Sequence, residues 1–188
     1  SFYKVDQGQV LSSSIDKYIY VVIKRQVGIV ENRYRINWSK VEFCNEIDEI
    51  EHPIVREALR FFNIDFPIEI STFSDIPGST GLGSSSAFCV GLVHALYALL
   101  GKYASKHTIA SEAGNIEVDI LKRTMGKQDH FASAYGNLNV FTFNSDESVN
   151  VEPVFYDSKI RNKLEANLML FYTKITRNAS DVLESQDK

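Results

Sequence analysis

Residues 77–87 read Pro77-Gly78-Ser79-Thr80-Gly81-Leu82-Gly83-Ser84-Ser85-Ser86-Ala87. The run lies between a strand-like segment, residues 67–73, and a long apolar segment, residues 87–100. Glycine tolerates positive φ and brings no Cβ, so the backbone N–H groups of such a loop can converge on one point. The apolar segment predicts a helix, whose first turn adds unpaired N–H groups and the positive end of the helix dipole. All eleven residues are therefore candidates to bind a phosphate-bearing cofactor.

Two well-known phosphate loops do not fit this run. Gly78 and Gly83 have the spacing of a Walker A motif, but Ser84 stands where that motif needs lysine. Gly81 and Gly83 begin a dinucleotide fingerprint, which Ser86 interrupts where a third glycine belongs. The complete pattern instead resembles the nucleotide loop of the GHMP kinases (galactokinase, homoserine kinase, mevalonate kinase and phosphomevalonate kinase). The alternative interpretation is an ordinary loop that leads into a buried helix.

Composition excludes several other classes of protein. The 188 residues are 44% hydrophobic and 23% charged, which is typical of a soluble globular protein. A net charge of −4 gives no reason to expect nucleic acid or an anionic membrane as a partner. Cys44 and Cys89 are the only cysteines, and the chain does not begin with a basic, then apolar, stretch. We therefore expect a reduced, cytoplasmic protein without structural zinc.

Periodicity predicts a mixture of strands and helices. Strands are expected over residues 10–24 (one long strand, or two with a bend), 34–38, 67–73, 138–143, 149–154 and 168–173. Helices are expected over residues 52–62, 84–100 and 108–122, followed by a polar helix at the end of the chain. Residues 34–38 are predicted to pair with residues 10–24. The absence of regular βαβ alternation favours an α+β fold over a doubly wound sheet.

The helices carry more specific predictions. Thr108 is the expected N-cap of the helix over residues 108–122. The apolar side chains at helical spacing predict an inner stripe of that helix: Ile109, Ala113, Ile116 and Ile120. The helix over residues 84–100 is apolar nearly all round, so Cys89 and His94 within it are predicted to be packed inside.

A second polar segment offers a catalytic carboxylate. Asp129 lies between Lys127 and His130, and nearby positive charge favours an ionised carboxylate. In a kinase such a group could accept the proton of a substrate hydroxyl or orient that hydroxyl electrostatically. Asp129 and Lys127 are therefore the candidate catalytic residues. The alternative is a turn aspartate that caps a helix beginning at Phe131.

Glu117, twelve residues before Asp129, is the candidate metal ligand. Mg²⁺ prefers hard oxygen donors, and it is often held by one carboxylate together with phosphates and waters. A serine hydroxyl from the loop, from Ser84 or Ser85, could supply a further donor, and Ser85 is preferred. A solitary glutamate at this position is otherwise most often a solvated residue on a helix surface.

The GHMP resemblance extends over most of the chain and implies roles for these residues. The segment over residues 126–130 is similar to the one that holds the catalytic aspartate in galactokinase-type members, which implies that role for Asp129. The preceding acid of the family coordinates magnesium, which implies that role for Glu117. The implied fold is that of ribosomal protein S5 domain 2. Residues 1–173 would form the ATP-binding N-terminal domain, and residues 174–188 would begin a ferredoxin-like C-terminal domain that is otherwise absent.

Within the family, the sugar-phosphate branch is the most similar. The resemblance implies ATP and Mg²⁺ as cofactors and a sugar or sugar-phosphate hydroxyl as acceptor, with the anomeric hydroxyl of D-glycero-D-manno-heptose 7-phosphate as the narrowest expectation. Arg177 is the candidate that would hold a substrate phosphate, and the alternative is an exposed arginine near a helix cap. A homodimer is the assembly to test. A galactokinase-like or other sugar-1-kinase, and a non-catalytic nucleotide-binding homologue, are the alternatives.

Overall fold

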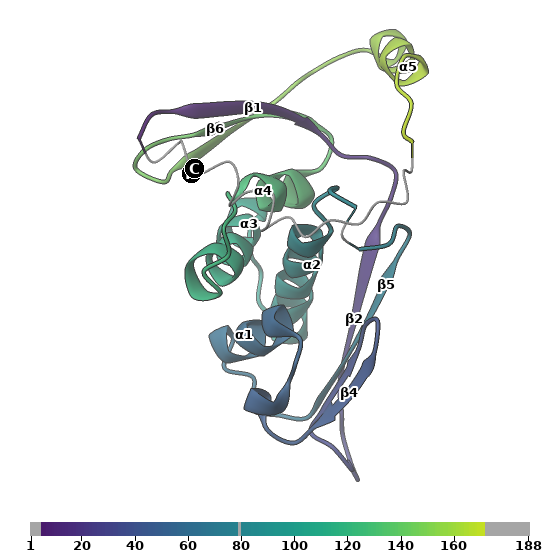
Figure 1. Cartoon of the computed structure of the whole chain (residues 1–188), viewed down its shortest axis with the longest axis vertical. Helices are drawn as coiled ribbons and strands as arrows, with labels where there is room; N and C mark the ends of the chain where they lie inside the picture. Colours follow the sequence, from purple (N-terminus) through teal and green to yellow (C-terminus); the bar gives the residue numbers. More distant parts are fainter. Residues whose placement is uncertain (1–4, 79, 172–188) are drawn as a thin grey trace.

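Figure 1 shows the computed structural model of the chain, which describes residues 5–78 and 80–171. The strands are β1 (Gly8–Ser13), β2 (Ile19–Arg25), β3 (Tyr34–Asn37), β4 (Val41–Cys44), β5 (Ile68–Ser74), β6 (Leu138–Phe143) and β7 (Val149–Pro153). The helices are α1 (Pro53–Phe61), α2 (Ser84–Leu99), α3 (Lys106–Gly114), α4 (Gln128–Tyr135) and α5 (Ser158–Ala166), with a 3-10 helix η2 (Ile47–Glu49) and a π-helix η3 (Asn115–Ile120). Ser79, Arg177 and residues 174–188, all named above, lie outside the described residues.

The described strands form two sheets. The smaller is antiparallel and has the order β1-β6-β7, and the larger has the order β2-β5-β3-β4. Residues 10–24, expected as one strand or two, are divided between the sheets, because β1 pairs with β6 and β2 pairs with β5. The chain thus crosses between the sheets at the bend between these two strands, and the observed mixture of elements confirms the α+β class.

The predicted pairing of residues 34–38 with residues 10–24 is wrong. Strand β3 runs parallel to β5, with Tyr34 opposite Ile68, and antiparallel to β4. Strand β2 pairs antiparallel with the other edge of β5. Alternation of side chains identifies a strand but says nothing about its neighbour, and here a central strand, β5, separates the two segments.

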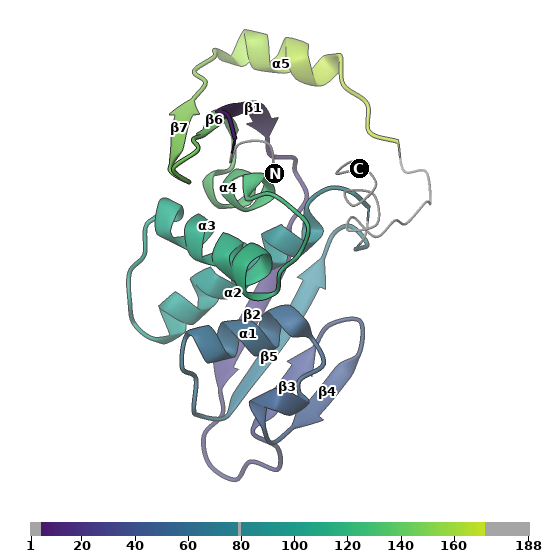
Figure 2. The same cartoon turned by 60° about the vertical axis from the view of Figure 1, so that its left-hand side comes forward.

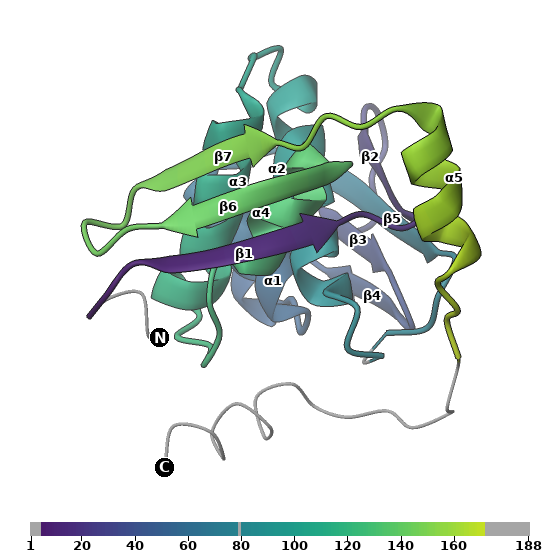
Figure 3. The same ribbon diagram turned by 90° about the horizontal axis from the view of Figure 1, so that it is seen from above.

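Helices fill the space between the sheets (Figures 1 and 3). Helix α2 lies centrally and packs against β2 on one side and against α1, α3 and α4 on others. Its buried side chains are Ser86, Phe88, Cys89, Val90, Leu92, Val93 and Leu96. Cys89 is buried as predicted, but His94 is exposed, so its predicted core position is wrong. Among the described helices none, α2 included, is long and apolar enough to cross a membrane.

Two core clusters correspond to the two sheets. The larger lies between the β2-β5-β3-β4 sheet and helices α1 and α2, and includes Ile36, Leu59 and Leu92. The smaller joins α3 and α4 to the other sheet through Ala110, Phe131, Phe141, Phe143 and Val149. Helix α4 is therefore held against β6, and it also packs against α2.

The helix expected over residues 108–122 begins earlier and changes its geometry. Ser105 is the N-cap, because its side chain accepts a hydrogen bond from the Thr108 amide, so the prediction for Thr108 is wrong. After Gly114 the chain continues as the π-helix η3. A π-turn holds one more residue than an α-turn, which rotates the following side chains. Ile120 consequently leaves the predicted inner stripe and is 40% exposed.

The C-terminal part of the described chain differs from the expectation. Residues 168–171, predicted to belong to a strand, are irregular and exposed. Helix α5, which was not predicted, precedes them and has no buried residue. Figure 2 shows α5 away from the helices that pack between the sheets. Without a buried face, periodicity gave little indication of a helix there.

Candidate functional site

Within the run over residues 77–87, two glycines with left-handed backbone precede α2, which begins at Ser84. Gly81 and Gly83 have φ angles of +78° and +68°, a region that L-residues with a Cβ rarely adopt. Gly83 is the N-cap of α2 and offers no side-chain cap, while its carbonyl accepts the Ala87 amide at 2.9 Å. The first-turn N–H groups of α2, from Ser84 onward, therefore face the loop without the side-chain oxygen that usually caps them.

One loop hydroxyl is buried without a partner. Among the described residues, Ser86 Oγ is shielded from solvent and makes no hydrogen bond. A buried hydroxyl without a partner lowers the stability of the protein, and a ligand that supplies the missing hydrogen bond removes this cost. Ser85, one residue earlier, is only half-buried and does have protein partners. The start of α2 thus presents polar groups that the protein itself leaves unsatisfied.

Glu117 is the centre of a buried polar cluster. Its side chain is completely buried, and Ser85 Oγ donates to its Oε1 at 2.5 Å. Arg123 NH1 donates to the same Oε1 at 2.5 Å and to Ser85 Oγ at 2.6 Å. His130 Nε2 lies 2.9 Å from the other carboxylate oxygen, Oε2. Glu117 is therefore a buried residue, and it is not the solvated residue on a helix surface that the sequence also allowed.

These partners keep the carboxylate ionised. Burial by itself raises the pKa of Glu117, but hydrogen bonds from His130 and Ser85 and the positive charge of Arg123 outweigh it, so the pKa lies below its ordinary value. Because an ionised carboxylate can only accept, His130 Nε2 carries the proton. Glu117 is therefore ionised at neutral pH beside the N-terminal end of α2, and the Arg123 guanidinium balances its charge within the cluster.

The π-helix explains how Glu117 reaches this place. The Leu121 amide donates to the Ile116 carbonyl at 3.0 Å, an i→i+5 bond. In an uninterrupted α-helix Ile116 and Ile120 would share the inner face. In the wider π-turn the buried residues are instead Ile116 and Glu117. The helical distortion is thus the local feature that buries an acid behind the loop.

The side chain of Asp129 lies next to Gly83. It belongs to the first turn of α4, and its Oδ2 lies 3.1 Å from the position that a Cβ on Gly83 would occupy. The N-cap of α4 is Lys127, so Asp129 does not cap a helix that begins at Phe131. The structure therefore brings together three features far apart in sequence: the glycine loop, Glu117 and Asp129.

The two basic residues near Asp129 in sequence, Lys127 and His130, contact residues elsewhere in the chain. His130 points to Glu117, since successive helix residues project in different directions. The Lys127 ammonium lies 3.1 Å from Glu147 Oε2 and 3.6 Å from Asp119 Oδ2, and its stem packs against Gly114. A catalytic role for Lys127 stays a prediction.

Sequence reasoning missed Arg123 and the contact of His130 with Glu117. Arg123 follows the π-helix, and its guanidinium returns to the acid six residues earlier. No spacing rule for regular helices predicts this contact. The position of His130 could have been inferred from Asp129, because a helix that turns Asp129 toward the loop turns the next side chain inward.

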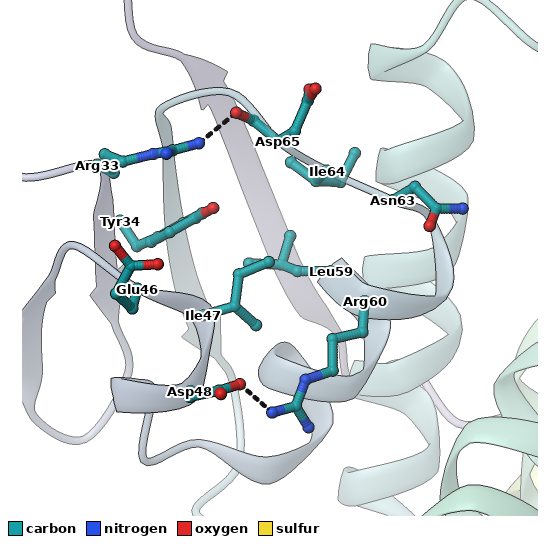
Figure 4. A pocket seen from close by; sticks show the side chains of 10 residues that line it. All are labelled: Arg33, Tyr34, Glu46, Ile47, Asp48, Leu59, Arg60, Asn63, Ile64 and Asp65. Carbon is teal, nitrogen blue, oxygen red and sulfur yellow. Dashed lines mark hydrogen bonds and ion pairs between the residues drawn. The ribbon is translucent and has the colours of Figure 1, made fainter.

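A separate hollow lies elsewhere on the molecule. Figure 4 shows this open groove of about 630 Å³, formed by η2, the start of β3 and the end of α1. Its charged lining is mixed, with Arg33 and Arg60 as well as Glu46, Asp48 and Asp65. None of its lining residues belongs to the loop over residues 77–87. The balance of charges gives it no preference for an anion such as phosphate.

The donors beside the loop suit magnesium better than a self-contained metal centre. No cluster of three or more His, Cys, Asp or Glu side chains able to hold a metal occurs within residues 5–78 and 80–171. Ser85 Oγ and Glu117 Oε1 are hard oxygen donors, 2.5 Å apart, and one is ionised. Mg²⁺ commonly takes one or two protein oxygens and completes its shell with phosphates and waters. The residues present therefore fit Mg²⁺ bound together with a nucleotide.

Comparison with known proteins identifies similar chains. Residues 50–137 match the family described as "GHMP kinases N terminal domain". D-glycero-alpha-D-manno-heptose 7-phosphate kinase of Campylobacter jejuni is 32% identical over 186 residues, which cover 94% of this chain and 55% of that protein. Galactokinase of Thermotoga petrophila is 23% identical over 198 residues, which cover 97% and 55%. The chain thus spans about half the length of these curated relatives.

A solved structure confirms the fold. The crystal structure of a D-glycero-D-manno-heptose 1-phosphate kinase from Bacteroides thetaiotaomicron superposes with a TM-score of 0.79 at 24% identity. The match covers 88% of this chain and 57% of that one. At this identity the superposition establishes the architecture alone, and it agrees with the α+β class.

Proposed function

This chain carries a GHMP kinase N-terminal domain, and from that premise we propose that the full-length protein is an ATP-dependent kinase acting on a sugar or sugar phosphate. The observation that carries the proposal is the convergence of three features at the start of α2. They are the glycine turn at Gly83, the Ser85–Glu117 pair and the carboxylate of Asp129. A nucleotide-binding module without catalysis would need neither acid.

ATP would bind with its phosphates on residues 77–87. The left-handed turns at Gly81 and Gly83 leave backbone N–H groups open to an anion, and the α2 dipole adds favourable potential there. Ser79 would take part as well, although it lies outside the described residues.

Ser85 and Glu117 would hold Mg²⁺, which neutralises charge on the transferred phosphoryl group when it is bound. Asp129 would accept the proton of the acceptor hydroxyl or orient that hydroxyl electrostatically. Lys127, the N-cap residue of α4, would contribute by fixing the start of the helix that carries Asp129. His130 would keep Glu117 oriented from the buried side.

The identity of the acceptor substrate is the most specific part of the proposal. The named relatives include a heptose 7-phosphate kinase and a galactokinase, so the anomeric hydroxyl of D-glycero-D-manno-heptose 7-phosphate is our first choice and a free hexose our second. Arg177, outside the described residues, would bind the substrate phosphate. A homodimer and a cytoplasmic location stay predictions, which sedimentation and fractionation would test.

A coupled assay of ADP release by the full-length protein tests the function. We expect turnover with ATP, Mg²⁺ and heptose 7-phosphate, and little with free galactose. Turnover with galactose alone would overturn the heptose assignment and leave the kinase class intact. Tight ATP binding with no turnover on any sugar or sugar phosphate in the panel would favour the non-catalytic homologue.

The glycine turn allows a matched pair of variants. Gly83→Ala would place a Cβ 3.1 Å from Asp129 Oδ2 at a φ of +68°, whereas Gly101→Ala, beyond the other end of α2, has a similar φ of +65° and meets no atom within 4 Å. Left-handed φ costs about 1–2 kcal/mol for a residue with a Cβ, so we expect the loop to shift and the Kd for ATP to rise about tenfold in Gly83→Ala. Calorimetric titration measures both variants, and equal Kd values would contradict a role for this turn.

A further inference from the structure

The position proposed for magnesium already faces a positive charge from the protein. Arg123 NH1 lies 2.5 Å from Glu117 Oε1 and 2.6 Å from Ser85 Oγ. These are the two oxygens that fit Mg²⁺. The guanidinium therefore satisfies, in the protein alone, the same lone pairs that a metal ion would use.

Arg123 and a metal ion cannot both keep this arrangement. A coordinated Mg²⁺ lies about 2.1 Å from each donor oxygen, closer than the guanidinium nitrogen does. If it approaches from the side of Arg123, it takes the place of NH1. If it approaches from another side, it lies within a few ångströms of a like charge in a partly buried site. In either case the ion pair of Arg123 with Glu117 has to weaken.

We propose that Arg123 is a resident cation of the metal site: it holds Ser85 and Glu117 together in the metal-free protein, and a divalent ion must displace it to bind. The inference rests on the proposed function, which assigns those two oxygens to magnesium. Arg123 is thus a positioning residue that sets how readily the site takes a metal ion.

The two ends of this ion pair differ in their freedom to move. The Glu117 side chain is 0% exposed and is held on its far side by His130, whereas the Arg123 side chain is 30% exposed. The backbone of Arg123 is anchored, since its amide donates to the Glu117 carbonyl at 3.1 Å and its carbonyl accepts the Met125 amide at 2.9 Å. Displacement therefore needs only rotation of a long side chain toward solvent, while the acid stays in place.

Metal binding without nucleotide tests the inference. Mn²⁺, which takes the same oxygen ligands as Mg²⁺, is titrated into the nucleotide-free full-length protein and followed by electron paramagnetic resonance. The variants are Arg123→Met, Arg123→Lys and Glu117→Gln, with Lys122→Met as a control that removes one exposed charge next in sequence. Thermal unfolding confirms that each variant is folded.

We expect Arg123→Met to bind Mn²⁺ about tenfold more tightly than the unchanged protein, because the competing charge is gone. Arg123→Lys and Lys122→Met should stay close to the unchanged Kd, and Glu117→Gln should lose the site. If Glu117→Gln loses the site but Arg123→Met binds equally or more weakly, the inference is overturned and the metal assignment stands. If Glu117→Gln binds Mn²⁺ normally, the metal assignment fails and the inference fails with it.

Discussion

Asp129→Asn in the full-length protein should lower kcat by about 10²–10⁴-fold, the usual contribution of a positioned acid–base group. Asparagine keeps the size of the side chain, so its packing against Gly83 survives, but it neither takes a proton nor carries the negative charge. The phosphate loop is unchanged, and the Kd for ATP should remain within about threefold of the original value. Steady-state kinetics and nucleotide titration on the same preparation separate the two effects.

Asp146→Asn is the matched control for this substitution. Asp146 lies exposed in the turn between β6 and β7, where it accepts hydrogen bonds from Ser148. It has no proposed part in nucleotide binding or catalysis. The kcat of the Asp146→Asn variant should equal that of the unchanged protein. A kcat for Asp129→Asn within tenfold of the original would remove Asp129 from the mechanism.

Removal of Glu117 should affect folding and turnover separately. Glu117→Ala leaves His130 and Arg123 without their common carboxylate in a buried site, which we expect to lower the free energy of unfolding by about 3 kcal/mol. Glu117→Gln keeps the shape and some hydrogen bonds, so its loss of stability should be smaller. Both variants lose the ionised donor, so turnover should need much more Mg²⁺ or cease.

Urea unfolding of the metal-free and nucleotide-free protein measures the first effect, and turnover against Mg²⁺ concentration measures the second. Glu165→Ala is the control, because it breaks an exposed Arg161–Glu165 pair on α5, which is worth about 0–1 kcal/mol. Equal losses of stability in Glu117→Ala and Glu165→Ala would contradict the buried cluster. A stable Glu117→Gln variant with an unchanged need for Mg²⁺ would contradict the metal role.

Local patterns predicted much of the secondary structure. Helices α1 and α2 and strands β5, β6 and β7 lie where spacing and alternation placed them, because each buries one regular face or is buried throughout. The errors fall where that condition is not met. Helix α5 buries nothing, residues 168–171 form no strand, and Ile120 leaves its stripe because η3 is not an α-helix.

Pairing between distant segments could not be read in the same way. Strand β3 has the alternation of an ordinary strand, yet its partners are β5 and β4, and β2 lies beyond β5. Each of these strands would pair acceptably with several others by local chemistry. Which strands pair depends on which apolar sheet faces the helices between the sheets cover. That arrangement is a property of the whole molecule.

The sequence by itself determined the glycine- and serine-rich run over residues 77–87 and the apolar helix that follows it, because these residues are contiguous and their local chemistry can be read in order along the chain. It also supplied the two acids, Glu117 and Asp129. Only the tertiary structure decided what surrounds them. The buried ionised state of Glu117 depends on Ser85, Arg123 and His130, which a π-turn and the packing of α4 bring to one carboxylate. Electrostatic environment acts through space, and distance along the chain does not predict it.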